Sequence, residues 1–482
     1  MRFVTRILLL VTGLVPLTAQ AQIQNFKHVV VIVQENRTPD NLFHGLCAPP
    51  YGACAVPPTF FAPYDIQTSK WKTKTGTINP QPEPLANTYD LGHSYKAFNA
   101  MCDVVPGNPP SCKMDGAAGV PCGARKGFTC PPNPQFKFVD NSAGIVNPYL
   151  TLASQYGWAN YMFQTNQGPS FPAHQFLFGG TSAPSREDDA NGIFAAENMT
   201  VKTAGAGCTS ASATRVAILS PNPTPVPYGV ENSTLYPCFE HQTMGDLVKD
   251  WKYYAAGATS IWTGPDAIEH ICLPSGGVCT GWGSHVNANK PAQVLTDIGN
   301  CNFHELTWVT PTAPNSDHNN LNDGGGPSWV ASIVNAIGNS TCTDTVNHKT
   351  LSYWQDTAIF ITWDDWGGWY DHEAPTFLPG VQGDYQYGFR VPLVVVSAYT
   401  PVGFVDNQRH DFGSILRFIE FNFANLGLKE GELGFADSRS TTDLREFFNL
   451  SRVPRTFITI AAPKNADFFI NDPRPPEPPD ND

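Results

Sequence analysis

The residues with the clearest chemical potential are two clusters of oxygen-bearing side chains, each directly after a predicted β-strand. The clusters are Glu35-Asn36, which follows the continuous apolar run 29–33, and Asp364-Asp365, which follows the β-branched and aromatic run 358–363. Both runs are typical of buried strands. Adjacent carboxylates repel each other at neutral pH unless a cation or a cationic side chain lies between them. Since ligands bind at the carboxyl ends of strands in α/β sheets, the clusters together predict one site for a divalent cation.

Each cluster also has a purely structural interpretation. Asp-Asp-x-Gly is ordinary loop composition, so Asp364 and Asp365 could form a solvated turn. Glu35, Asn36 and Arg37 could instead cap a helix or form salt bridges. We favour the cation site because both clusters stand at the same kind of strand end.

Ser170 lies between two prolines in the segment 168–172, Gly-Pro-Ser-Phe-Pro. The prolines restrict the backbone and could hold one hydroxyl rigidly towards a metal ion. A serine hydroxyl becomes a useful nucleophile only when a base or a metal lowers its pKa. From these residues alone, a simple turn serine is the favoured interpretation. The sequence contains no Gly-x-Ser-x-Gly, Cys-x-Pro-x-Arg or His-Glu-x-x-His, which argues against α/β-hydrolases, sulfatases and zincins.

Three segments carry a resemblance to a known family: residues 34–40, 167–172 and 363–372. In this order they resemble the signature blocks of a bacterial phosphoesterase family. That family unites phosphatidylcholine-type phospholipases C with secreted acid phosphatases, within the alkaline-phosphatase-like superfamily. The resemblance, which extends over residues 26–448, implies a phosphoserine or phosphothreonine mechanism and makes Ser170 the candidate nucleophile. The segment Pro172-Ala173-His174 differs from the family's usual Pro-Asn-Arg, and it resembles the acid-phosphatase branch more than the phospholipases.

The resemblance also implies a metal-binding set made entirely of oxygen ligands. Its members are Glu35, Asn36, Ser170, Asp364 and Asp365. Oxygen ligands favour Ca²⁺ or Mg²⁺. Zn²⁺ or Fe would also fit, because carboxylates bind these metals and histidines are close in the expected site.

Three histidines lie in segments similar to the family's active-site segments, and they are His93, His270 and His318. We expect His318 to donate a proton to the leaving oxygen, and the other two to contact phosphate oxygens. Asp371 and His372 should order the loop beyond the metal site rather than bind the ion. His174 could replace the missing Asn-Arg chemistry or could simply pack within a helix.

The composition indicates an exported, acidic protein. The 482 residues carry a formal charge of −13, so the surface should not attract nucleic acid or an anionic bilayer. Residues 1–21 have the pattern of a secretory signal peptide, with Arg2, Arg6, an apolar stretch and a terminal Ala-Gln-Ala. We expect a secreted or periplasmic protein without a stable membrane anchor.

Twelve cysteines in an exported chain predict up to six disulfides. The candidate pairs close in sequence are Cys47 with Cys54, Cys102 or Cys112 with Cys122 or Cys130, and Cys272 with Cys279. Zinc binding is the alternative. Disulfides are favoured because no pair has CxxC spacing and export exposes the chain to an oxidising environment.

Alternating strand and helix patterns predict an α/β fold with a doubly wound, mainly parallel central sheet, helices on both faces and long disulfide-stapled loops. The resemblance implies that this fold is alkaline-phosphatase-like. The expected helices are 147–159, 243–251, 328–337 and 412–423, and the expected strands include 251–255 and 391–397. Residues 22–465 should form one catalytic domain, and the Pro-rich residues 466–482 a disordered tail.

We therefore expect a hydrolase of phosphoric ester bonds whose partner is a small phosphorylated substrate, namely a phosphate monoester. The alternative is a phospholipase C that cleaves the phosphodiester of a phospholipid head group. A third possibility, from another class, is an exported binding protein that has the fold without the activity. The sequence contains no indication of the oligomeric state.

Overall fold

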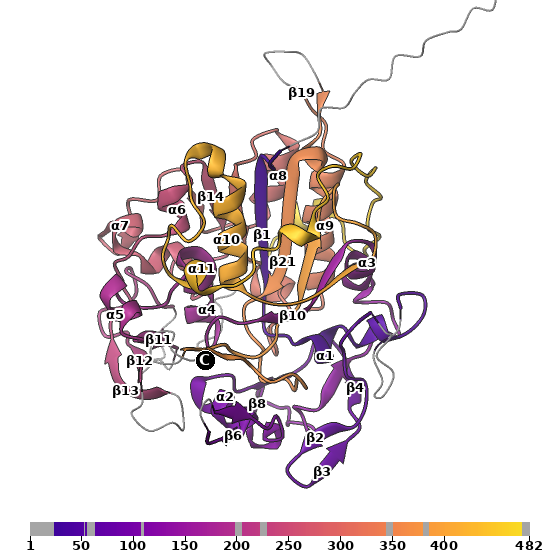
Figure 1. The fold of residues 1–482 in the computed structure, drawn as a ribbon, viewed down its shortest axis with the longest axis vertical. Coiled ribbons are helices and arrows are strands. Elements are labelled where there is room, and N and C mark those ends of the chain that lie inside the picture. The colour runs from indigo at the N-terminus through magenta and orange to yellow at the C-terminus, as the bar shows by residue number, and fades with distance from the viewer. Residues whose placement is uncertain are drawn as a thin grey trace, which may run out of the picture.

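An eight-stranded sheet organises the protein (Figure 1). The structure is a computed structural model that describes residues 24–52, 54, 63–107, 110–197, 205–221, 229–343, 350–378 and 385–474. The strands, in their order across the sheet, are β17 (Val286–Asn287), β14 (Trp251–Tyr254), β18 (Leu306–Val309), β1 (His28–Gln34), β21 (Thr357–Trp363), β24 (Leu393–Val396), β10 (Gly157–Phe163) and β25 (Phe404–Asp411).

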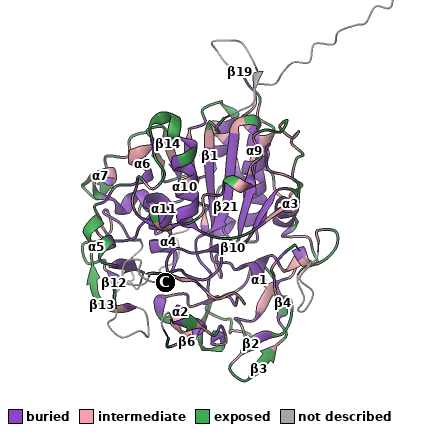
Figure 2. Ribbon diagram, viewed as in Figure 1, coloured by how far each residue is buried: buried purple, intermediate pink, exposed green. Residues whose placement is uncertain are grey.

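The sheet is mainly parallel, as predicted. β1 pairs in parallel with both β18 and β21, and only β24 runs antiparallel to its two neighbours, β21 and β10. Nearly every residue of β1 and β21 is buried (Figure 2). This burial explains why both strands are continuous apolar runs, since both faces of each strand are covered.

Helices cover both faces of the sheet. Phe360 of β21 packs on Phe418 of α10 (Phe412–Asn422), with ring centroids 5.0 Å apart. Trp363, three residues on and therefore on the opposite face, packs on Tyr149 of α3 (Asn147–Gln155) at 5.1 Å. On the first face, α4 (Ser170–Gly179) and α11 (Ala436–Arg439) pack on α10, and α6 (Met244–Leu247) packs on α4. On the other face, α9 (Gly326–Gly338) packs on α3, and α8 (Gln293–Gly299) packs on α9.

Three sequence-based expectations about the elements differ from the structure. The helix expected over 243–251 is confined to α6, and β14 begins at Trp251. The helix expected over 147–159 ends at Gln155, and β10 begins at Gly157. The aromatic residues that follow favour a buried strand over a longer helix. The tail expected from residue 466 is ordered as far as the structure describes it. α12 (Ala466–Ile470) packs Phe469 on Trp329, with ring centroids 5.3 Å apart. Residues 475–482 and the expected signal peptide lie outside the described residues.

A subassembly of short elements, built from residues 63–139, lies against the carboxyl ends of the central strands (Figure 1). It contains α2 (Tyr95–Cys102) and small sheets formed by β2 (Trp71–Thr73), β3 (Gly76–Ile78), β4 (Gln81–Glu83), β5 (Tyr89–Leu91), β6 (Val104–Val105), β7 (Ser111–Cys112), β8 (Cys122–Ala124) and β9 (Lys137–Val139). No helix among the described residues is long and apolar enough to cross a bilayer.

All twelve cysteines form disulfides, as expected for an oxidising environment. The bonds are Cys47–Cys54, Cys102–Cys112, Cys122–Cys130, Cys208–Cys238, Cys272–Cys279 and Cys301–Cys342. The pairing expected across the second and third bonds is wrong, because the hairpin β6–β7 returns Cys112 to Cys102. The zinc alternative is excluded by the same bonds, which leave no thiolate.

Candidate active site

The strand register brings the two oxygen-bearing clusters together. Gln34 and Trp363 are the last paired residues of β1 and β21, so the residues that follow them leave the sheet side by side. The Asp364 main-chain N–H donates to the Gln34 carbonyl at 2.9 Å, and the Arg37 N–H donates to the Asp365 carbonyl at 3.0 Å. Pairing thus continues beyond the strands and fixes both clusters at the carboxyl edge of the sheet.

The turn at this edge depends on unusual backbone conformations. Asn36 has a positive φ of 63°, which asparagine tolerates better than most residues. Its main-chain N–H donates to Asp364 Oδ1 at 3.0 Å. Gly367 also has a positive φ, and a Cβ added there would lie 2.4 Å from the Asn36 carbonyl oxygen. The glycine after the acidic pair is therefore required by the close approach of the two chain segments.

Ser170 is the first residue of α4, a helix whose ten residues are all buried. Pro169 caps the helix and Pro172 stands in its first turn, where no intrahelical N–H is needed. The Ser170 hydroxyl lies 3.3 Å from Asp365 Oδ2 and 3.4 Å from Glu35 Oε2. The serine is therefore joined to both clusters at a helix N-terminus, where the helix dipole favours negative charge.

His174 lies one helical turn beyond Ser170 and faces the same clusters. Its Nε2 is 3.2 Å from Glu35 Oε1 and 3.9 Å from Asp364 Oδ2. Burial lowers the pKa of this histidine to about 4. Its position among the carboxylates was not predicted as part of the ligand set, although the i, i+4 spacing from Ser170 is a signal that could have indicated it.

His93 and His318 lie together beside Asn36, with ring centroids 6.0 Å apart. His93 comes from the subassembly of short elements, and its Nε2 is 3.2 Å from Asn36 Nδ2. Its Nδ1 bonds the Leu91 carbonyl at 2.7 Å. His318 Nδ1 bonds the Asn319 carbonyl at 2.7 Å, and the ring lies 6.0 Å from that of Trp262.

His270 is not brought to these residues by any described contact. It belongs to α7 (Glu269–Cys272), and its side chain is about one third exposed. Nδ1 lies 2.7 Å from Glu240 Oε1, and Nε2 lies 3.0 Å from Asp246 Oδ1. The acid-rich surroundings raise the pKa of His270, chiefly through the hydrogen bond to Asp246. These contacts describe a surface ion-pair network, and a role for His270 in contacting phosphate stays a prediction.

The buried carboxylates fit a cation. Burial and the neighbouring charge of Asp364 raise the pKa of both Glu35 and Asp365 well above their ordinary values. Among the described residues, Asn36 Oδ1 and Asp364 Oδ2 are buried oxygens that accept no hydrogen bond. A divalent ion between the clusters would neutralise the carboxylates and satisfy both orphaned oxygens. The predicted set of Glu35, Asn36, Ser170, Asp364 and Asp365 is therefore gathered at one place with suitable chemistry.

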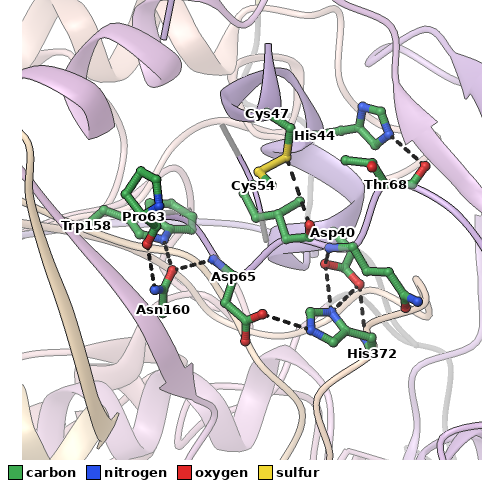
Figure 3. The surroundings of a disulfide bond; sticks show 12 residues. Asp40, His44, Cys47, Cys54, Pro63, Asp65, Thr68, Trp158, Asn160 and His372 are labelled. Carbon is green, nitrogen blue, oxygen red and sulfur yellow. Dashed lines mark hydrogen bonds and ion pairs between the residues drawn. A yellow bond between two sulfur atoms is a disulfide. The ribbon is translucent and has the colours of Figure 1, made fainter. Parts of the chain in front are cut away.

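A second network, which we did not predict from sequence, fastens the two segments that carry the clusters. His372 Nδ1 lies 2.8 Å from Asp40 Oδ2, and its Nε2 lies 3.3 Å from Asp65 Oδ1 (Figure 3). Arg390 is fully buried and pairs with Asp371, with Nε 2.8 Å from Oδ1. Asp40 follows one cluster along the chain, whereas Asp371 and His372 follow the other. The loop-ordering role expected for Asp371 and His372 agrees with this geometry.

Comparison with known proteins identifies the family. A profile of the Phosphoesterase family matches residues 26–426. The chain belongs to the Phosphoesterase family. This result confirms the resemblance seen in the three sequence segments around Glu35, Ser170 and Asp364.

The curated relatives of this Phosphoesterase family chain are similar at low identity. The "Non-hemolytic phospholipase C" of Burkholderia pseudomallei is 29% identical over 149 residues, which are 26% of this chain and 20% of that protein. The "Phospholipase C B" of Mycobacterium tuberculosis is 23% identical over 189 residues, 35% of this chain and 34% of that protein. The "Hemolytic phospholipase C" of Pseudomonas aeruginosa is 21% identical over 83% of this chain and 53% of its own length.

The match therefore spans between one fifth and about half of these relatives. A solved structure titled as a protein in the alkaline phosphatase superfamily, from Vibrio parahaemolyticus, aligns with a TM-score of 0.29 and 12% identity over 57% of this chain and 60% of that chain.

Proposed function

We propose that this chain is an exported, metal-dependent phosphoesterase that hydrolyses phosphate monoesters through a phosphoserine at Ser170. The observation that carries the proposal is the position of the Ser170 hydroxyl, within 3.4 Å of two buried carboxylates at a helix N-terminus. The carboxyl edge of an α/β sheet is where such folds bind ligands. The six disulfides support export.

The reaction has two displacements at phosphorus. In the first, Ser170 Oγ forms a bond to phosphorus while the bond to the leaving oxygen breaks. The hydroxyl proton passes to a neighbouring carboxylate, and the leaving oxygen takes up a proton. In the second, water attacks the phosphoserine, the P–Oγ bond breaks, and phosphate leaves as Ser170 regains its proton. His318 is our candidate for exchanging the proton with the leaving oxygen, because its ring lies 6.0 Å from that of His93, which contacts Asn36.

Glu35, Asn36, Ser170, Asp364 and Asp365 would hold the metal ion. When bound, a divalent ion lowers the pKa of a ligating hydroxyl and neutralises phosphate charge. The residues of the chain supply the remaining requirements. α4 holds Ser170 at its first residue, and the whole helix is buried, so the Ser170 hydroxyl is held in contact with Glu35 and Asp365.

The preference for monoesters rests on charge. A monoester dianion needs more positive or donating groups than a diester. His93, which contacts Asn36, and the neighbouring His318 are our candidates to provide them. The formal charge of −13 also opposes docking on anionic membranes. Phospholipase C activity is the second candidate, because several relatives carry that name.

The test compares kcat/KM for p-nitrophenyl phosphate, p-nitrophenylphosphorylcholine and phosphatidylcholine between pH 5 and 8, with Ser170→Ala as the control. We expect the monoester to be hydrolysed fastest. A clear preference for phosphatidylcholine would move the chain to the second candidate. Full activity of folded Ser170→Ala would remove the nucleophile from the proposal, and no hydrolysis by the wild type would favour a binding protein.

A further inference from the structure

The side chain of His174 is enclosed entirely by the site. It has no exposed surface, and its Nε2 faces Glu35 Oε1 at 3.2 Å and Asp364 Oδ2 at 3.9 Å. Nε2, Glu35 and Asp364 each offer one ligand atom within 4.8 Å of the others. All three residues are buried, so water does not screen their interactions.

The other ring nitrogen of His174 is oriented by Tyr253. The Tyr253 hydroxyl donates its one proton to the Trp262 carbonyl at 2.8 Å. It can therefore only accept from its other neighbours, which are the Gly264 N–H and His174 Nδ1, each at 3.5 Å. This arrangement favours the tautomer in which Nδ1 carries the proton and Nε2 carries a lone pair. A histidine whose second nitrogen donates to an oxygen is the usual arrangement around a bound metal.

Three electron-rich atoms then face one another. Nε2 of this tautomer cannot donate to Glu35 Oε1, and Asp364 Oδ2 accepts no hydrogen bond from any described residue. Lone pairs at 3.2 and 3.9 Å repel unless a proton or a metal ion lies between them. Ligand atoms that share one ion at about 2.1 Å lie about 3 to 4 Å from each other. The observed separations therefore match those of atoms that share a cation.

We propose that His174 contributes Nε2 as a nitrogen ligand to the metal site, so that the site selects a borderline divalent metal such as Zn²⁺ or Fe²⁺ over Mg²⁺ or Ca²⁺. Imidazole suits these metals, whereas hard ions prefer oxygen alone. This inference rests on the metal site of the proposed function and changes the preference expected from the all-oxygen set. Tyr253 is a positioning residue that holds the ring.

The direct test is pulsed electron paramagnetic resonance on the full protein, stripped with chelator and loaded with Mn²⁺. The wild type should show coupling between the ion and an imidazole nitrogen. Folded His174→Gln should lose that coupling and bind Zn²⁺ at least tenfold more weakly, with less than threefold change for Mg²⁺. His241→Gln is the matched control, since His241 is also buried and its Nδ1 bonds the Gln242 carbonyl. It should behave as the wild type does.

Tyr253→Phe keeps the ring of His174 and removes only its acceptor. We expect the nitrogen coupling to persist and the Zn²⁺ affinity to fall about tenfold, as for loss of an outer hydrogen bond to a ligand. Absence of nitrogen coupling in the wild type, or its persistence in folded His174→Gln, would overturn the inference.

Hydrolysis of p-nitrophenyl phosphate, measured on the same preparations, separates the two proposals. Turnover by wild type that lacks nitrogen coupling would refute the role of His174 and leave the phosphoesterase intact. The opposite outcome is a wild type that shows nitrogen coupling but no turnover, with the coupling lost in His174→Gln. It would refute the proposed function and leave His174 as a metal ligand.

Discussion

Replacing His372 with glutamine should weaken the fold most below pH 6.5 and least above pH 10. Burial alone would lower the pKa of this histidine, but the charge of Asp40 and hydrogen bonds to Asp40 and Asp65 raise it from 6.5 to about 10. Because the folded pKa is raised, the stabilisation is fully present below 6.5 and is lost as pH rises through 10. The perturbation acts on the network that ties the segment after Asp365 to the segment after Asn36.

The size of the effect follows from the same values. A pKa raised from 6.5 to about 10 corresponds to at most about 5 kcal/mol, since one pKa unit is worth about 1.4 kcal/mol. The side chain is 19% exposed and Asp65 is 22% exposed, so solvent screening reduces this limit. We expect His372→Gln to lose about 2 to 3 kcal/mol at pH 6 and less than about 1 kcal/mol at pH 10.5.

Equilibrium urea unfolding, followed by tryptophan fluorescence with the disulfides intact, measures this difference at each pH. His304→Gln is the control, because His304 also pairs with a carboxylate, at 2.6 Å from Asp250, but on the surface and away from the site. Its effect should stay below about 1 kcal/mol at every pH. A wild-type-minus-variant difference for His372 that is constant from pH 6 to pH 10.5 would refute the reasoning.

Chelation should lower the melting temperature of the wild type, and the gap to metal-loaded protein should widen from pH 5 to pH 8. The pKa values of Glu35 and Asp365 are raised, so protons can replace the cation at low pH, and this replacement is lost as pH rises. A difference in melting temperature between chelated and metal-loaded protein that does not change with pH would contradict this prediction. Gly367→Ala should cost more than about 2 kcal/mol in urea unfolding and abolish activity, because its Cβ would meet the Asn36 carbonyl. Gly276→Ala has a similar positive φ without any atom within 4 Å, so it should cost about 1 kcal/mol, and equal costs for the two would exclude the clash as the cause.

The parts of the site that could be predicted are those indicated by neighbouring residues within one segment of the chain. Glu35 and Asp364 were predicted because each polar cluster directly follows an apolar run, and such runs become buried strands. Parallel neighbours at the centre of a sheet leave no other place for these side chains than its carboxyl edge. Ser170 was also singled out by its sequence neighbours, since it lies between two prolines. Only the family resemblance distinguished a nucleophile from a turn serine.

The parts that were missed depend on contacts between distant segments. Arg390 joins Asp371 and Asp40. These three residues come from three separate stretches of chain, so no local pattern indicates the network. The pairing of Cys102 with Cys112 depends on the hairpin β6–β7, whose two-residue strands are not defined by cysteine spacing alone. Similarly, the surroundings of His270 are set by Glu240 and Asp246, and its sequence neighbours do not indicate them.

The central claim is that Ser170 carries the phosphoryl group. Wild-type protein mixed with ³²P-labelled p-nitrophenyl phosphate and quenched in acid within milliseconds should retain label that peptide mapping assigns to Ser170. Folded Ser170→Ala should retain no label and lose nearly all turnover. Label on a histidine would contradict the account. So would steady turnover by the wild type without any trapped phosphoserine, if Ser170→Ala turned over at the same rate.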